Sequence, residues 1–118
     1  MIQPITVLAV RVGQKPQVET MLPTLEAMQR FVGGLVEKIE WLPDVSLVCN
    51  ANGRLAGLPF NRMLGYCDVL VGDAFFVRYD DDGNPTSLTD EDVAKLLVLV
   101  DEWAIYSPPR RKAGREDE

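Results

Sequence analysis

The chain has 118 residues, 47% of them hydrophobic and 25% charged, and it carries a net charge of −6 at neutral pH. These values predict one folded domain over residues 1–107 and exclude an intrinsically disordered chain, and the acidic balance argues against direct binding of nucleic acid. Because the chain has no histidine, it also lacks Ser-His and Cys-His nucleophile pairs and the commonest metal ligand.

The N-terminal part of the sequence predicts two strands and one helix. Ile5 to Val12 is apolar and β-branched and stops at Gly13, which indicates a first strand, and Gln17 to Met21 is expected to form a short second one. Pro23 to Val32 carries apolar residues at helical spacing. Since Gly33-Gly34 follows, we expect a helix of about three turns that ends there.

The middle of the chain predicts a hairpin followed by a long loop. Leu35 to Leu42 and Val45 to Cys49 are rich in strand-forming residues, and the break between them predicts that they pair. The Asn50 to Gly53 segment is a turn that leads into a short strand at Arg54-Leu55. Gly57 to Asp68 shows no clear period, so a loop with at most one helical turn is expected there.

The C-terminal part predicts further strands and the best-defined helix. Val69 to Val71 and Ala74 to Tyr79 indicate one bent strand or two short ones, broken at Gly72-Asp73. Thr89 with Asp92 fits a helix cap, and an apolar stripe follows at Val93, Leu96, Leu97, Val100, Trp103 and Ala104. We expect this stripe to cover the sheet, so that Leu97→Ala costs about 2–5 kcal/mol.

This order of elements predicts an α+β fold. We expect an antiparallel or mixed sheet of about five to six short strands, with two main helices packed on one face. Pro108-Pro109 should end the last helix and leave a disordered charged tail over residues 108–118. No apolar run is long enough to span a bilayer, and residues 1–12 lack the pattern of a signal peptide, so a cytoplasmic protein without membrane contact is expected.

The residues that suggest a metal or cofactor have simpler interpretations. Cys49 and Cys67 have no CxxC spacing and are interpreted as buried small hydrophobes. Asp80 to Pro85 resembles a calcium loop, but Pro85 stands where that loop needs a glycine, so a solvated hairpin turn is expected. Trp41 and Trp103 are assigned to the core. We therefore expect no cofactor and no metal.

The segment from Gly57 to Arg62 is the candidate binding site. Gly57 and Pro59 fix the backbone, while Asn61 and Arg62 present an amide beside a planar guanidinium that suits an anion. The alternative is a turn whose Arg62 pairs with a surface acid. If the segment binds a ligand or partner, removing Arg62 should abolish binding and shift stability by only about 0.5 kcal/mol. If Asn61 and Arg62 are buried struts, the site is sought on the hairpin from Leu35 to Cys49.

The string from Asn50 to Arg62, followed by Gly72 and by Leu88-Thr89-Asp90, resembles a family borne by phages, plasmids and bacteria and described as domain of unknown function 3846. The similarity extends from about Ile5 to Trp103, and Gly-Leu-Pro-x-Asn-Arg is its most specific part. The resemblance implies a small accessory protein of a mobile element. It implies no activity.

Three functions remain open at this point. The leading hypothesis is a non-enzymatic accessory binding module that contacts a host protein or a small anionic ligand. One alternative is a counter-defence protein that sequesters a nucleotide signal through Arg62. The other is a small enzyme that uses carboxylates such as Asp68 or Asp73. The sequence leaves a homo-oligomer open.

Overall fold

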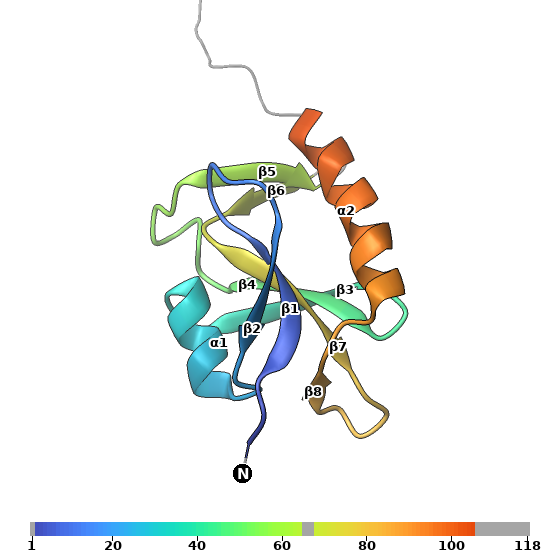
Figure 1. The fold of residues 1–118 in the computed structure, drawn as a ribbon. Helices are drawn as coiled ribbons and strands as arrows, with labels where there is room; N and C mark the ends of the chain where they lie inside the picture. The colour runs from blue at the N-terminus through green and yellow to red at the C-terminus, as the bar shows by residue number, and fades with distance from the viewer. Residues whose placement is uncertain (1, 65–67, 106–118) are drawn as a thin grey trace, which may run out of the picture.

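The computed structural model describes residues 2–64 and 68–105, with side chains described as far as Glu102. The elements are β1 (Ile5–Val10), β2 (Gln17–Met21), α1 (Leu25–Val32), β3 (Val36–Leu42), β4 (Val45–Asn50), β5 (Phe60–Leu64), β6 (Asp68–Val71), β7 (Ala74–Tyr79), β8 (Pro85–Thr86) and α2 (Asp90–Ile105). The α+β class and the antiparallel sheet are confirmed (Figure 1). Cys67 and the tail over residues 108–118 lie outside the described residues.

The main sheet is built around β7, which is the last of its five long strands in chain order. Its order is β2-β1-β7-β4-β3, with β8 paired to the end of β7, and all of these pairings are antiparallel. β5 and β6 form a separate antiparallel hairpin. Gly72 and Asp73 therefore separate two strands, as the sequence predicts, but the two strands belong to different sheets.

Each face of the main sheet carries its own apolar cluster, because successive strand residues point to opposite sides. Leu8, Phe76 and Leu47 lie in register across three strands and pack with the cluster that includes Leu96 of α2. Their chain neighbours Val7, Phe75 and Val48 pack with the second cluster.

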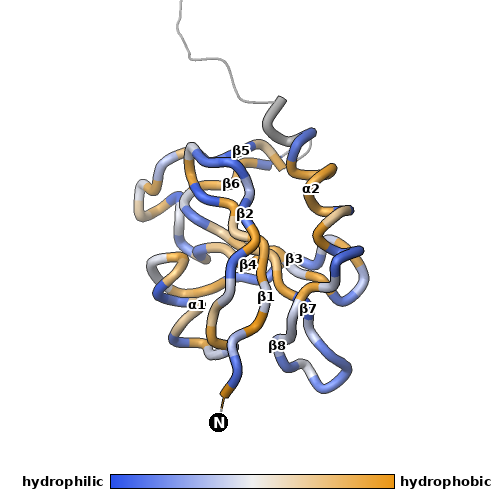
Figure 2. The backbone as a smooth tube through the Cα atoms, in the orientation of Figure 1, coloured by the Kyte–Doolittle hydropathy of each residue, from blue (hydrophilic) through white to orange (hydrophobic). Residues whose placement is uncertain are grey.

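The two helices cover opposite faces of the sheet. α1 contributes Met28 and Val32 to the second cluster, whereas α2 contributes Leu96 and Val100 to the first. Figure 1 shows the sheet passing between the two helices, and Figure 2 shows hydrophobic segments along the central strands. The expectation that both helices pack on one face is wrong. The central strands are apolar on both sides, and each side must be covered.

The predicted loop from Gly57 to Asp68 is also different in the structure. Residues 60–64 and the segment from Asp68 onward form the β5–β6 hairpin, whereas Arg54-Leu55, predicted as a strand, lies in a turn. β5 buries the polar side chains of Asn61 and Arg62 beside the apolar Leu64. Its sequence therefore lacks the apolar alternation that marks a half-buried strand.

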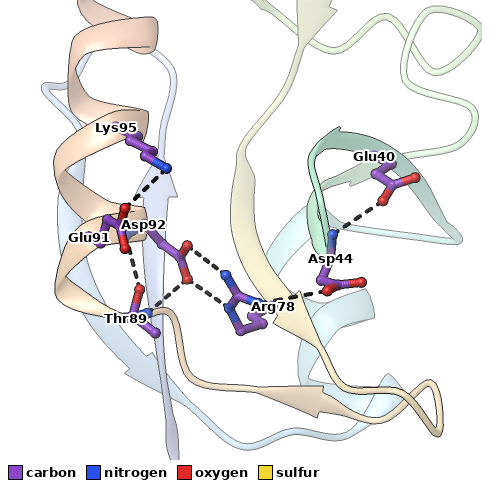
Figure 3. A network of polar contacts seen from close by, with 7 residues as sticks. All are labelled: Glu40, Asp44, Arg78, Thr89, Glu91, Asp92 and Lys95. Atoms are coloured by element: carbon purple, nitrogen blue, oxygen red, sulfur yellow. Dashed lines mark hydrogen bonds and ion pairs between the residues drawn. The ribbon is translucent and has the colours of Figure 1, made fainter.

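α2 begins with the predicted cap and an ion pair to the sheet. The Thr89 hydroxyl accepts from the Asp92 amide at 3.0 Å, and the Asp92 carboxylate accepts from the Thr89 amide at 2.9 Å. The same carboxylate accepts hydrogen bonds from Nε and Nη2 of Arg78 on β7 at 2.8 and 2.7 Å (Figure 3). These bonds lower the pKa of Asp92 to about 2. They fix the start of α2 over the sheet.

The apolar stripe of α2 is only partly buried. Leu96 and Val100 are fully buried, but Leu97 is 41% exposed and Val98 is 67% exposed. Trp103 and Ala104 lie beyond the described side chains. Leu97 therefore stands at the margin of the covered face, and its expected core role is wrong. Within the described residues, no helix combines the length and apolar character needed to cross a membrane.

Two neighbouring leucines test the burial of α2. Leu96→Ala should lower the free energy of unfolding by about 2–5 kcal/mol, because it removes packed atoms and leaves a cavity. Leu97→Ala should cost less than about 1 kcal/mol, because much of its side chain is already in water. Denaturant unfolding of both variants measures the difference. Equal losses would contradict this orientation of the helix.

The Arg78–Asp92 pair predicts how stability depends on pH. Because folding lowers the pKa of Asp92 to about 2, its stabilisation is complete above its unfolded-state pKa of about 4 and is lost as the pH falls through about 2. Asp92→Asn should therefore cost about 2 kcal/mol at pH 7, with a difference from wild type that narrows below about pH 4. The exposed Asp90→Asn serves as control. A difference independent of pH would argue against this ion pair.

Candidate functional site

The segment between β4 and β5 is tied by short polar contacts to α1 at one end and to the β6–β7 junction at the other. The side-chain nitrogen of Asn50 donates to the carbonyl oxygen of Val32 at the end of α1 at 3.1 Å, and its side-chain oxygen accepts from the backbone amide of Asn52 at 2.8 Å. At the other end, the Gly72 amide donates to the Pro59 carbonyl at 2.8 Å. The segment is therefore held over the β5–β6 hairpin.

A close approach at Gly72 fixes how the hairpin joins the sheet. Gly72 has a φ of +76°, in the region that side chains disfavour, and a Cβ there would lie 2.7 Å from Cδ1 of Leu58. Only a residue without a side chain satisfies both conditions. Leu58 thus packs over the junction between β6 and β7.

Asn61 joins this junction to the main sheet. Its amide nitrogen donates to the carbonyl oxygen of Val10 at 2.9 Å and to that of Gly72 at 2.8 Å. The side chain is only 8% exposed. One buried amide therefore satisfies two backbone carbonyls that lie at the end of β1 and between β6 and β7, which an apolar side chain could not do.

Arg62 is a buried cation without a carboxylate partner in the described part of the chain. It is 9% exposed, and it donates from Nη1 to the Asn61 side-chain oxygen and from Nη2 to the carbonyl of Gln14, both at 2.6 Å. Its Nε is buried and has no hydrogen-bond partner among residues 2–64 and 68–102. Burial lowers the pKa of Arg62. Among the described residues, no acid forms an ion pair with it.

The four residues predicted to form a site therefore do not share one surface. Gly57, with a φ of +71°, and Pro59 are exposed, whereas Asn61 and Arg62 are buried. The expectation that Arg62 is a surface residue is wrong, and within the described residues it has no ion pair with a surface acid. Their role in binding stays a prediction. The burial of both polar side chains directs attention to the hairpin from Leu35 to Cys49.

A cavity of about 270 Å³ lies against that hairpin. Its walls come from the β3–β4 hairpin, the β5–β6 hairpin and the segment between them. The apolar part of its lining includes Ile39, Cys49, Leu64 and Leu70. None of the four predicted site residues lines it. Asn61 and Arg62 instead hold the hairpin that forms one wall.

Charged side chains stand around this cavity. Glu37 on β3 is exposed, and Arg54 forms a salt bridge with Asp68 at the start of β6. Burial, together with the nearby Glu37 and Asp68, raises the pKa of the Cys49 thiol to about 11. The thiol is therefore protonated at neutral pH and is a poor nucleophile.

Other residues considered from the sequence have structural contacts. The Asp73 carboxylate accepts from the Val12 amide at 3.0 Å, and Asp80 accepts from the amides of Asp82 and Asn84 within the β7–β8 turn. The predicted hairpin turn is confirmed. Within the described residues, no three side chains of the metal-ligating types gather in one place.

Sequence reasoning missed the cavity because its walls are distant in the chain. Glu37 and Asp68 approach one another only when β5–β6 folds over β3–β4. The available signal was the charged Glu37 two positions before Ile39, on the side of β3 that packs toward the first apolar cluster.

The buried position of Asn61 and Arg62 predicts large effects on stability. Asn61→Ala should lower the free energy of unfolding by about 2–4 kcal/mol, because the carbonyls of Val10 and Gly72 lose their donor. Arg62→Ala should cost more than about 1 kcal/mol through lost packing and lost hydrogen bonds. Asn52→Ala, at an exposed position, should change stability by less than about 0.5 kcal/mol. Denaturant unfolding of the three variants measures these losses. An Asn61→Ala variant as stable as the wild type would contradict the anchoring role of Asn61.

Comparison with known proteins gives a family but no relative of known function. No curated protein matches the chain, and no solved structure matches it. Residues 5–101 match the family described as a domain of unknown function, DUF3846. This span runs from the first residue of β1 to within α2 and so includes both hairpins around the cavity. The chain belongs to the DUF3846 family.

Proposed function

We propose that this protein is a non-enzymatic binding module that receives an extended segment of a host protein between its two hairpins. In this proposal it is an accessory protein of a phage or plasmid, as the resemblance implies. The observation that carries the proposal is the cavity of about 270 Å³ beside the open edge of β3. Such a volume accommodates one side chain of a partner rather than a whole cofactor.

The position of β3 explains how a partner could be held. β3 is the last strand of the main sheet, so one of its edges carries backbone groups that no other described strand pairs. Glu37 and Ile39 are two residues apart on β3 and both line the cavity. A peptide that pairs with this edge would direct alternate side chains to the same side. One of them would enter the cavity.

The lining of the cavity favours a basic side chain. Ile39, Leu64 and Leu70 offer an apolar surface for an aliphatic stem. Asp68 is already paired with Arg54, so the exposed Glu37 is the carboxylate of the lining that has no ion pair within the described residues. Lysine and arginine combine such a stem with a charged end. The net charge of −6 also favours a basic partner through long-range attraction.

A small anionic ligand is the second candidate, in line with a protein that sequesters a nucleotide signal. Arg62 supports it, since a buried guanidinium with an unpaired Nε and no carboxylate partner would gain from an anion. Arg62 does not line the cavity, so a ligand would have to part the β1–β2 turn from β5. The protein-binding proposal needs no such rearrangement.

Capture from an extract of the host tests the proposal. The tagged chain should retain a partner, and Glu37→Arg should weaken that capture at least about tenfold, because it reverses the charge at the rim of the cavity. Glu102→Arg makes the same change of charge at an exposed position of α2 and should leave capture intact. Equal capture by both variants would contradict this site. A small anion retained in native mass spectra of the wild type, lost in Arg62→Met, would support the second candidate instead.

A further inference from the structure

The edge of the main sheet opposite β3 presents an uncharged row of side chains. On β2, Val18 and Thr20 pair with Leu8 and Thr6 of β1, so both point to the same side of the sheet. Val18 is 55% exposed and Thr20 is exposed. Leu22 continues the spacing of two just beyond the strand and is 47% exposed. We call Val18, Thr20 and Leu22 the edge row.

The one charged residue of β2 is neutralised on the other side of the sheet. Glu19 receives both terminal nitrogens of Arg11 in a bidentate ion pair, and the Arg11 guanidinium also lies 4.6 Å from the centre of the Phe31 ring. The β3 edge, by contrast, carries Glu37 and Lys38. Charged residues normally protect sheet edges from pairing with other strands. β2 lacks this protection.

The edge row has the same pattern in both directions, with an apolar residue on each side of a threonine. A strand with this property can pair with an identical strand about a two-fold axis. If the axis passes at Thr20, Val18 lies opposite Leu22 of a second copy, and the two threonines face each other. Apolar pairs and threonine pairs both stabilise antiparallel strands.

The neighbouring registers are less favourable. An axis at Glu19 would place two carboxylates opposite one another, and like charges in that position destabilise a strand pair. An axis at Val18 would place Pro16 opposite Thr20, where proline has no amide hydrogen to donate. The axis at Thr20 places Glu19 opposite Met21, which avoids the like-charge pair. It also moves the first proline contact, Pro23 opposite Gln17, to the end of the paired span, because Pro23 lies outside β2.

We propose that this protein forms a two-fold dimer in which β2 pairs antiparallel with β2 of a second copy, with Thr20 on the axis. The dimer joins the two main sheets into one continuous sheet. It leaves β3 and the cavity at the outer ends, so it does not depend on the binding proposed above.

Disulfide formation tests the register directly. In a background that carries Cys67→Ser, Thr20→Cys should give a disulfide-linked dimer under mild oxidation, since each residue at the axis meets its own copy. Val18→Cys alone and Leu22→Cys alone should link far less. An equal mixture of these two variants should link well. Efficient linking of Val18→Cys alone, or none by Thr20→Cys, would overturn the proposal.

Sedimentation equilibrium tests the association without a covalent link. The wild type should be dimeric, and Val18→Lys should weaken dimerisation at least about tenfold by placing a charge in the pair. Val98→Lys adds the same charge at a more exposed position of α2 and should leave the dimer unchanged. Because each copy carries a net charge of −6, added salt should strengthen the wild-type dimer. A wild type that stays monomeric, or two lysine variants with equal effects, would refute it.

Discussion

Two hydrogen bonds from the amide of Asn61 determine how the two sheets of this protein meet. They end on the carbonyl oxygens of two buried residues, Val10 at the end of β1 and Gly72 between β6 and β7. The β5–β6 hairpin is thereby fixed over the first apolar cluster, and its position defines one wall of the cavity. The Gly-Leu-Pro-x-Asn-Arg string therefore holds the β5–β6 hairpin against the main sheet. Any binding by the cavity depends indirectly on these contacts.

Arg78 and Arg62 are stabilised in different ways. Arg78 has a full counter-charge, because Asp92 accepts two of its hydrogen bonds at the start of α2. Within the residues that the structure describes, Arg62 has only neutral acceptors, a side-chain amide and a backbone carbonyl, and its Nε has none. Burial of a charge without a partner is costly, and buried arginines usually have one. Both arginines secure the fold, but only Arg78 does so through an ion pair within the described residues.

Much of the fold could be predicted from local patterns in the sequence. β2, the β3–β4 hairpin and the cap of α2 follow from alternation, turn residues and the Thr89–Asp92 spacing, and each is confirmed. β5 could not be predicted in this way, because a strand that buries Asn61 and Arg62 has the composition of a loop. The opposite placement of the helices depends on central strands that are apolar on both sides. The cavity requires residues from β3 and β6 to meet, and no local pattern carries that information.

The central position of β7 has a consequence for synthesis of the protein. β1 and β4 do not pair with each other, and residues 74–79 separate them in the finished sheet. A nascent chain that has emerged only as far as β4 can therefore form the β1–β2 and β3–β4 hairpins, but it cannot join them. Until β7 arrives, the inner edges of both hairpins remain open to other strands. The segment translated between β4 and β7 thus sets how long the growing polypeptide is exposed to aggregation on the ribosome.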